Sequence, residues 1–264
     1  HNNQNITDPW IEKSNAANAG IDGAKIVWAD EKDLVTSPSI AHDASNNAYL
    51  DFEVKQANIK SGNAVVAVTK NGTVVWSWHL WFAPKDALST IAVTNLTNKT
   101  YNFTTETLGW HPVKWEHTTY TTARTVKVKV EQTIANNGTK QVAVLNITQN
   151  PGIKRTGITT FYQFGRKDAL PGTDTFYPTN GYSFDNTPGG RSLGYAIQHP
   201  ENMFIYASTG SSYYWDWCNA TYYNLWSADN TTDGFNDNAV VKTVYDPCPV
   251  GFKMPASNAF TGFT

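Results

Sequence analysis

The fold of this chain is decided by residues 63–81, which read NAVVAVTKNGTVVWSWHLW. Residues 64–68 form a short run of small and β-branched apolar side chains, which is typical of a strand. The Asn71-Gly72 pair tolerates the positive φ angles that a two-residue type I′ turn requires. Residues 74–81 return as a second strand, so we predict a β-hairpin. The return strand carries tryptophan on both faces, which indicates that both faces are covered.

Strand signals continue on both sides of this hairpin. Residues 49–54 alternate between polar and apolar side chains, as a half-buried strand does. A second hairpin is predicted from the alternating runs 125–131 and 141–148, which flank an Asn-Asn-Gly turn at 136–138. We expect the valines of its first strand to face a core and the charged side chains to face water.

The composition favours strands and loops over helices. The chain has 264 residues, enough for one large domain or two ordinary ones, and 13% of them are aromatic. Only 16% of the residues are charged and the net charge is −2, which does not favour nucleic acid or an anionic membrane as a partner. No run approaches the roughly 20 apolar residues of a membrane span, so no transmembrane segment is predicted.

The composition of the chain changes after residues 150–152, where the sequence Asn-Pro-Gly interrupts the strand pattern. Alternating strands precede the break, while the part that follows is rich in Gly, Tyr, Phe and Trp. In that second part a short helix is predicted within 191–202, ended by Pro200. We therefore predict a mainly β protein with two domains, 1–150 and 151–264.

Several stretches resemble a known group of bacterial surface proteins. Residues 25–30, 62–68 and 75–81 resemble the β-domain of the Bacteroidales fimbrillin superfamily. Residues 161–168, FYQFGRKD, resemble the opening of a C-terminal module found in many of these proteins. Residues 244–255, with the sequence Asp-Pro-Cys-Pro-Val-Gly, resemble the most specific signature of that module, the Fibrobacter major paralogous domain.

This resemblance implies an Ig-like β-sandwich-type region over 1–150 and an α+β C-type-lectin-like module over 151–264. Both are expected to be incomplete here, the second one C-terminally truncated, as parts of a longer protein. The implied function is a cell-surface adhesin or fimbrial (pilus) tip subunit that binds host or glycan ligands without catalysis.

The same resemblance implies an extracellular location on the outer membrane or fimbrium of a Gram-negative bacterium. The expected partners are other fimbrial or surface-complex subunits and carbohydrate. Two alternatives stay open: a surface glycan-binding accessory lipoprotein of a nutrient-uptake system, and a purely structural pilus subunit.

The residues themselves give little support to catalysis. The sequence has no HExxH, G-x-S-x-G or P-loop motif, so we predict that the chain is not an enzyme. Scattered carboxylates such as Asp168, Asp174 and Asp185 leave a glycosidase as the alternative. His79, on the tryptophan-rich strand, is interpreted as a packed ring.

Aromatic and oxygen-rich side chains gather between residues 211 and 238. Flat rings can stack on the apolar face of a sugar while carboxylates receive its hydroxyl groups. The predicted binding residues are Tyr213, Tyr214, Trp215, Tyr222, Tyr223, Asp229 and Asp233. The alternative is that the aromatic side chains belong to the core, above all Trp217. No cofactor is predicted, although the run 229–238 leaves a calcium ion as an alternative.

Cys218 and Cys248 are the only cysteines of the chain. They could form a disulfide, bind other chemistry or stay as free buried thiols. Because the rest of the composition is typical of an extracellular protein, we predict the disulfide. The bond would close a loop of about 31 residues and hold the oxygen-rich run within it.

Overall fold

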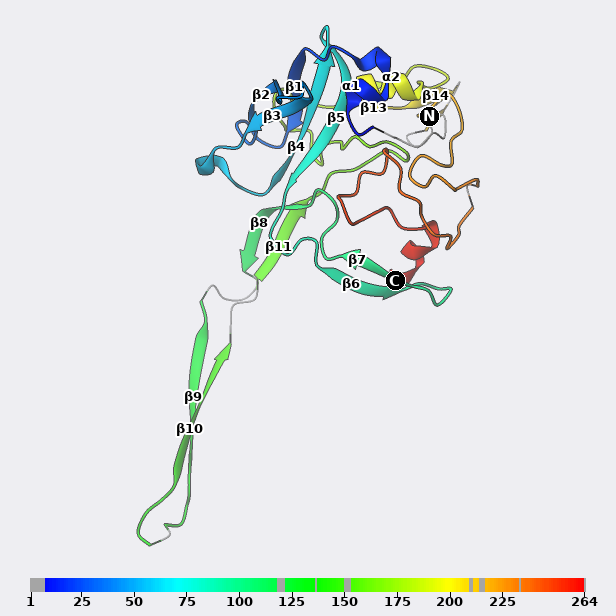
Figure 1. The fold of residues 1–264 in the computed structure, drawn as a ribbon. Helices are drawn as coiled ribbons and strands as arrows, with labels where there is room; N and C mark the ends of the chain where they lie inside the picture. The colour runs from blue at the N-terminus through cyan, green and yellow to red at the C-terminus, as the bar shows by residue number, and fades with distance from the viewer. Residues whose placement is uncertain are drawn as a thin grey trace. The chain divides into compact units, whose positions relative to one another are not determined.

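The computed structural model describes residues 8–117, 122–135, 137–149, 153–208, 211–213, 217–232 and 234–263 (Figure 1). The protein is mainly β, with 37% strand and 10% helix, as the sequence predicts. The chain divides into two compact units, of which the larger comprises His1–His111 and Ile158–Thr264 and the smaller Pro112–Gly157.

Short strands account for most of the regular structure. The strands are β1 (Gly23–Ala29), β2 (Thr36–His42), β3 (Ala48–Glu53), β4 (Gly62–Lys70), β5 (Thr73–Phe82), β6 (Thr90–Thr94), β7 (Thr100–Thr104), β8 (His111–His117), β9 (Arg124–Glu131), β10 (Val142–Gln149), β11 (Ile153–Ile158), β12 (Ser183–Asp185), β13 (Asn202–Phe204), β14 (Tyr206–Ser208) and β15 (Ser211–Tyr213). The α-helices are α1 (Ile11–Ser14) and α2 (Leu193–Gln198), and the 3-10 helices are η1 (Ala16–Asn18), η2 (Gln56–Asn58) and η3 (Ser257–Gly262).

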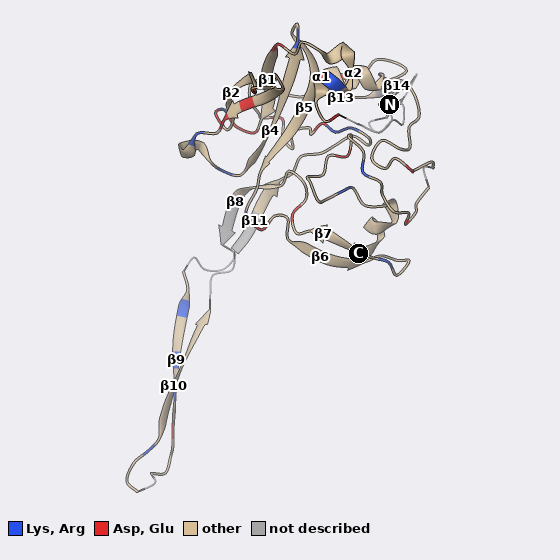
Figure 2. Cartoon of the chain, viewed as in Figure 1, with Lys and Arg blue, Asp and Glu red and all other residues tan. Residues whose placement is uncertain are grey.

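The predicted hairpin forms the centre of the larger unit. β4 pairs antiparallel with β5 on one side and with β1 on the other, giving the order β1-β4-β5. Asn71 and Gly72 have φ angles of 50° and 77°, as the type I′ turn requires. Lys70 is the one charged residue of β4 and β5 (Figure 2). Such an apolar pair of strands suits the middle of a protein, and β4 is buried from Gly62 to Thr69.

Both faces of this sheet are covered, as the tryptophan pattern predicts. On one face, Ala64 and Val66 pack in a core cluster that includes Leu50 from β3. On the other face, Val65 packs with Trp28 and with Ala169. A register shift after Ile26 in β1 turns Trp28 towards this second face. The Trp28 indole Nε1–H donates a hydrogen bond of 2.9 Å to the carbonyl oxygen of Ala169.

Segments from both predicted domains share the core of the larger unit. Besides the Trp28–Ala169 contact, Ala29 and Tyr177 exchange two backbone hydrogen bonds of 2.8 Å. The boundaries of the two compact units therefore differ from those of the predicted domains, because the larger unit contains residues from both sides of position 150.

The second predicted hairpin is confirmed as β9 paired with β10 (Figure 1). The expectation that its valines face a core is wrong, because both strands are exposed along their whole length. Val126, Val128 and Val130 are 58%, 41% and 55% exposed. The alternation that predicts the strand is real, but its apolar face has no core to cover within the smaller unit.

The short helix predicted within 191–202 is α2. The Ser192 hydroxyl caps its N-terminus by accepting a hydrogen bond of 3.2 Å from the Tyr195 backbone N–H. Leu193 and Ala196 lie in a core cluster with Trp217, which is 3% exposed and therefore a core residue, as the alternative interpretation holds. Within the described ranges, no helix is long and apolar enough to span a bilayer.

Candidate functional site

The predicted ligand-binding residues have different environments in the structure. Tyr222 is half-buried against the core cluster of α2, while Tyr223 is 37% exposed and Asp229 is exposed. Tyr223 and Asp229 belong to one loop, which Asn230 closes: its Nδ2 donates to the carbonyl oxygens of Tyr223 (2.8 Å) and Thr232 (2.9 Å). This loop could offer one ring and one carboxylate to a ligand.

The other predicted binding residues add no described side chain to this loop. The backbone of Tyr213 lies in β15, whereas Tyr214, Trp215 and Asp233 fall outside the described residues. In the part of the chain that the structure describes, no three His, Cys, Asp or Glu side chains are grouped so as to hold a metal ion.

The prediction of a disulfide is wrong, because Cys218 and Cys248 are not bonded to each other in the structure. Cys218 follows Trp217 beside the core cluster of α2 and forms an isolated bridge with Arg191. Cys248 lies in a turn where its backbone N–H donates a 2.9 Å hydrogen bond to Asp246. Burial raises the pKa of the Cys248 thiol to about 12. Separate local structures fix the two cysteines, and sequence spacing does not supply the geometry that a disulfide needs.

The oxygen-rich run contributes a structural clamp through Asp237. Its Oδ1 accepts hydrogen bonds from Asn95 Nδ2 (2.8 Å) and the Tyr101 hydroxyl (2.5 Å). Its Oδ2 accepts from Thr97 Oγ1 (2.6 Å) and Asn258 Nδ2 (3.0 Å). These hydrogen bonds, that from Thr97 first, lower the pKa of Asp237 to about 2. Three donors of the β6–β7 hairpin and one of the C-terminal segment therefore meet at this carboxylate, which ties the two together.

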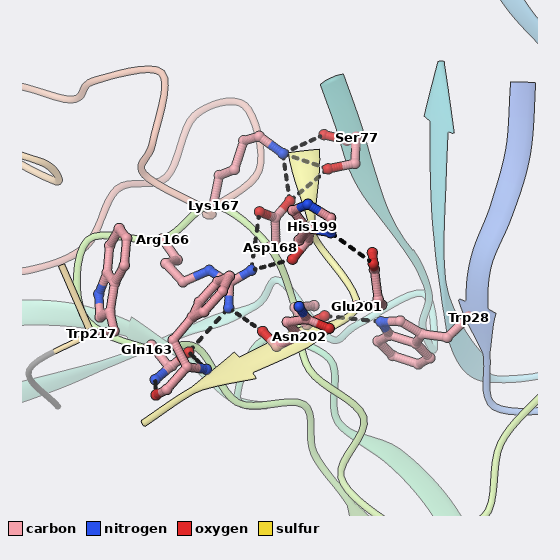
Figure 3. Close-up of polar contacts among 12 residues, drawn as sticks. Trp28, Ser77, Gln163, Arg166, Lys167, Asp168, His199, Glu201, Asn202 and Trp217 are labelled. Atoms are coloured by element: carbon pink, nitrogen blue, oxygen red, sulfur yellow. Dashed lines mark hydrogen bonds and ion pairs between the residues drawn. The ribbon is translucent and has the colours of Figure 1, made fainter. Parts of the chain in front are cut away.

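A cluster of three consecutive charged residues lies in the interior of the larger unit (Figure 3). Arg166, Lys167 and Asp168 are 2%, 8% and 4% exposed. The turn that carries them depends on Gly165, which has a φ of 81° and whose Cα faces Leu225 so closely that a Cβ would lie 2.4 Å from it. Buried charges of this kind are stable only when they are paired and hydrogen-bonded.

Lys167 and Asp168 meet Ser77 of β5. The Lys167 ammonium contacts Asp168 Oδ1 and the Ser77 hydroxyl, and it donates to the Ser77 carbonyl oxygen at 3.2 Å. The Ser77 hydroxyl donates to the same Asp168 oxygen at 2.6 Å. Lys167 Nζ also lies 4.5 Å from the centre of the Trp76 ring, a cation–π contact. Burial lowers the pKa of Lys167, and the Asp168 carboxylate opposes that shift.

Arg166 joins this cluster to β13 and to the end of α2. Its NH1 donates to the Asn202 carbonyl oxygen (2.6 Å) and to Gln163 Oε1 (3.0 Å), and its NH2 donates to the His199 carbonyl oxygen (3.3 Å). The guanidinium carbon lies 4.7 Å from the centre of the Phe204 ring. Burial lowers the pKa of Arg166, although carbonyl, carboxylate and ring contacts compensate the charge.

A serine, a lysine and an aspartate in contact are also the groups of an activated nucleophile. Here Ser77, on strand β5, is only 3% exposed, so a substrate has no access to its hydroxyl. Lys167 is held in an ion pair with Asp168 and donates to the Ser77 carbonyl oxygen, away from solvent. The geometry therefore assigns the cluster to the stability of the fold.

A second polar network starts at His79 and runs along the same face of the sheet. His79 Nε2 lies 2.9 Å from Asn63 Oδ1, and its Nδ1 lies 2.6 Å from the Tyr162 hydroxyl. Asn63 Nδ2 donates in turn to Asp30 Oδ2 at 2.9 Å, beside His111. Burial lowers the pKa of His79 to about 4, so the ring is neutral at pH 7. This confirms the interpretation of His79 as a packed ring.

An apolar pocket of about 440 Å³ lies at the surface of the larger unit. Its floor is the first face of the sheet, where Val66 pairs with Trp78. Its rim includes Trp10, the residue before α1, and Tyr49 of β3. The Trp10 and Tyr49 rings meet edge to face, with centroids 5.0 Å apart. Tyr49 is 47% exposed and Trp78 is 37% exposed, so a ligand can reach both rings.

Polar contacts hold the α1 side of the pocket. Glu12 Oε1 accepts hydrogen bonds from the backbone N–H groups of Gly20 (2.9 Å) and Ile21 (2.8 Å). Lys13 Nζ donates to Asn47 Oδ1 at 2.5 Å and lies 5.6 Å from the centre of the Trp10 ring. The Glu12 contacts fold the segment before β1 on itself, and the Lys13–Asn47 contact joins that segment to the β2–β3 hairpin.

Sequence reasoning missed the residues of this pocket. Trp10 lies outside the predicted strands, while Tyr49 and Trp78 are on predicted strands that are far apart in the sequence. The available signal is an aromatic residue on the polar face of a strand, as Tyr49 is. An aromatic side chain on the polar face of a strand is exposed to solvent, which makes it a candidate for ligand binding.

Comparison with known protein families, curated proteins and solved structures finds no match to this chain.

Proposed function

We propose that this chain is a non-catalytic binding protein of a bacterial cell surface, of the adhesin or fimbrial tip type. Its ligand offers a flat apolar face, as a sugar ring does, to the pocket between Trp10, Tyr49 and Trp78. The observation that carries this proposal is the pocket itself, with exposed aromatic rings over a buried apolar floor.

The dimensions and chemistry of the pocket support a small ligand group. A volume of about 440 Å³ lies in the range of pockets that take small molecules. Aromatic rings supply a large contact area, and the Lys13–Asn47 pair provides polar groups at the rim. Open sites of this type bind weakly, often near about 1 mM or −4 kcal/mol, and work through many copies on one surface.

The finer parts of this proposal rest on the resemblance of the sequence. They are the Ig-like and C-type-lectin-like folds, the extracellular location and the partnership with other fimbrial subunits. A nutrient-uptake lipoprotein would use the same pocket for a dietary glycan, so the identity of the bound glycan separates it from an adhesin.

The test is a glycan array probed with the full chain in multimeric form. Tyr49→Ala and Trp78→Ala are each expected to reduce binding at least about tenfold, because each removes a ring that contacts the ligand. Tyr223→Ala is the matched control, since it removes an exposed tyrosine of the predicted loop and leaves the pocket intact. Equal loss in all three variants, or loss in Tyr223→Ala alone, would contradict the pocket. A multimer that binds no glycan would support the structural-subunit alternative.

A further inference from the structure

One face of the β9–β10 hairpin is apolar over three successive cross-strand pairs, with the polar pair Arg124 and Gln149 at its end. Three cross-strand pairs define it, and we call it the apolar hairpin face: Val126 with Ile147, Val128 with Leu145, and Val130 with Ala143. Because side chains alternate along each strand, the other face takes the residues between them. This pattern is that of a sheet with one side in a core.

The apolar hairpin face is open to water in the structure. Val126, Leu145 and Ile147 are 58%, 57% and 56% exposed. The charges of the two strands all lie on β9 (Figure 2). By the alternation of the strand, Lys127, Lys129 and Glu131 lie on the opposite face, and Arg124 lies at the end of the apolar hairpin face. Contiguous exposed apolar side chains of this kind are candidates for a contact with a partner.

An isolated hairpin needs such a partner for its own stability. β9 and β10 form a two-stranded sheet, and a sheet of two strands is marginally stable in water. Covering the apolar hairpin face removes six side chains from water, which stabilises the strands as well as the contact.

We propose that the apolar hairpin face packs against the same face of a second copy of this chain. A two-fold axis through the central Val128–Leu145 pair makes the surface complementary to itself. The axis places the bulky Val126–Ile147 pair of one copy on the small Val130–Ala143 pair of the other. Large side chains then meet small ones at both ends of the contact, as well-packed layers require.

The charges favour the same arrangement. In the face-to-face pair, Lys127 and Lys129 of both copies point outwards, so like charges are separated by two sheets about 10 Å apart. Edge-to-edge pairing of two β9 strands would instead bring these lysines close together, which is a common protection against that mode.

The size of the contact predicts a weak dimer. Two strands of eight residues present a face of about 25 Å by 10 Å, which is small beside a standard interface of about 1,600 Å². We therefore expect dimers only at micromolar concentration or above, and a stronger effect where many copies are held side by side. The proposal concerns a surface distinct from the pocket and does not depend on it.

Analytical ultracentrifugation of the full chain tests the proposal over about a hundredfold range of concentration. The wild type is expected to shift from monomer to dimer, and Leu145→Asp to stay monomeric throughout. Val144→Asp is the matched control: it is the adjacent residue, 55% exposed against 57%, and it lies on the opposite face. It is expected to dimerise like the wild type.

Oxidative cross-linking gives a second measurement that does not depend on affinity. Because Val128 lies beside the two-fold axis, Val128→Cys is expected to form a disulfide-linked dimer at a much higher rate than Lys129→Cys on the opposite face. A wild type that is monomeric at every concentration would overturn the proposal. So would equal behaviour of Leu145→Asp and Val144→Asp, or equal cross-linking of the two cysteine variants.

Discussion

Removing the carboxylate of Asp168 should destabilise the protein more than removing an exposed carboxylate of the same segment. In the wild type this group pairs with Lys167, accepts from Ser77 at 2.6 Å and lies 3.6 Å from Arg166 NH2. Asp168→Ala leaves two buried cations without their anion. Breaking a buried ion pair in this way costs about 3–5 kcal/mol. This is a large part of the free energy of unfolding of a domain, which is about 5–15 kcal/mol.

Urea unfolding followed by tryptophan fluorescence measures this loss, with Asp174→Ala as the control. Asp174 lies in the same segment but is exposed, so its removal should change the free energy of unfolding by less than about 0.5 kcal/mol. If Asp168→Ala fails to fold, Asp168→Asn keeps the volume and a hydrogen bond to Ser77 and provides the measurement. A loss below about 1 kcal/mol for both Asp168 variants would refute the buried, paired state of this cluster.

Three further predictions concern the turn, a histidine and a cysteine. Gly72→Ala should destabilise by about 1 kcal/mol, because its φ is +77°, whereas Gly194→Ala in α2 should stabilise by about 0.5 kcal/mol; equal urea midpoints would contradict the turn. The pKa of His79 is lowered from 6.5 to about 4 by burial, so the unfolded state binds the extra proton and stability should fall by up to about 3 kcal/mol as the pH drops through this window. His79→Gln should flatten that dependence and His42→Gln, at an exposed position, should not; the opposite order in urea titrations at several pH values would count against the buried ring. Because its pKa is raised to about 12, Cys248 should react with a disulfide reagent at pH 8 at least about a hundredfold more slowly in the native than in the unfolded protein, and fast native labelling in mass spectrometry would show that the thiol is accessible.

The local features of the fold are those that the sequence predicts best. The Asn71-Gly72 turn follows from the conformational freedom of two residues, and α2 follows from apolar spacing with Pro200 after it. Each of these signals acts within a few residues, so it is visible without knowledge of the rest of the chain.

Contacts between distant segments could not be predicted in this way. The Ser77–Asp168 hydrogen bond joins residues 91 positions apart, and the Trp28–Ala169 bond joins residues 141 positions apart. The alternation in β9 predicts an apolar face but not whether the same chain covers it. Cysteine spacing likewise predicts a possible bond but not the positions of the two turns that hold the thiols.

The candidate pocket shows the same limit. Trp10, Tyr49 and Trp78 come from three elements that only the folded sheet brings together. The tyrosine loop is predictable because its aromatic residues are neighbours in the sequence, and Tyr223 and Asp229 are exposed there in the structure. Sites built from one segment are therefore visible in the sequence, whereas sites built from several segments are not.

Hydrogen exchange of the full chain with and without a bound glycan tests the central claim most directly. The ligand for this measurement is the glycan that gives the strongest signal on the array. Our account predicts slower exchange in residues 10–13 and 46–50, which form the rim of the pocket, and no change in 219–232. Protection confined to 219–232, with unchanged exchange around the pocket, would contradict it.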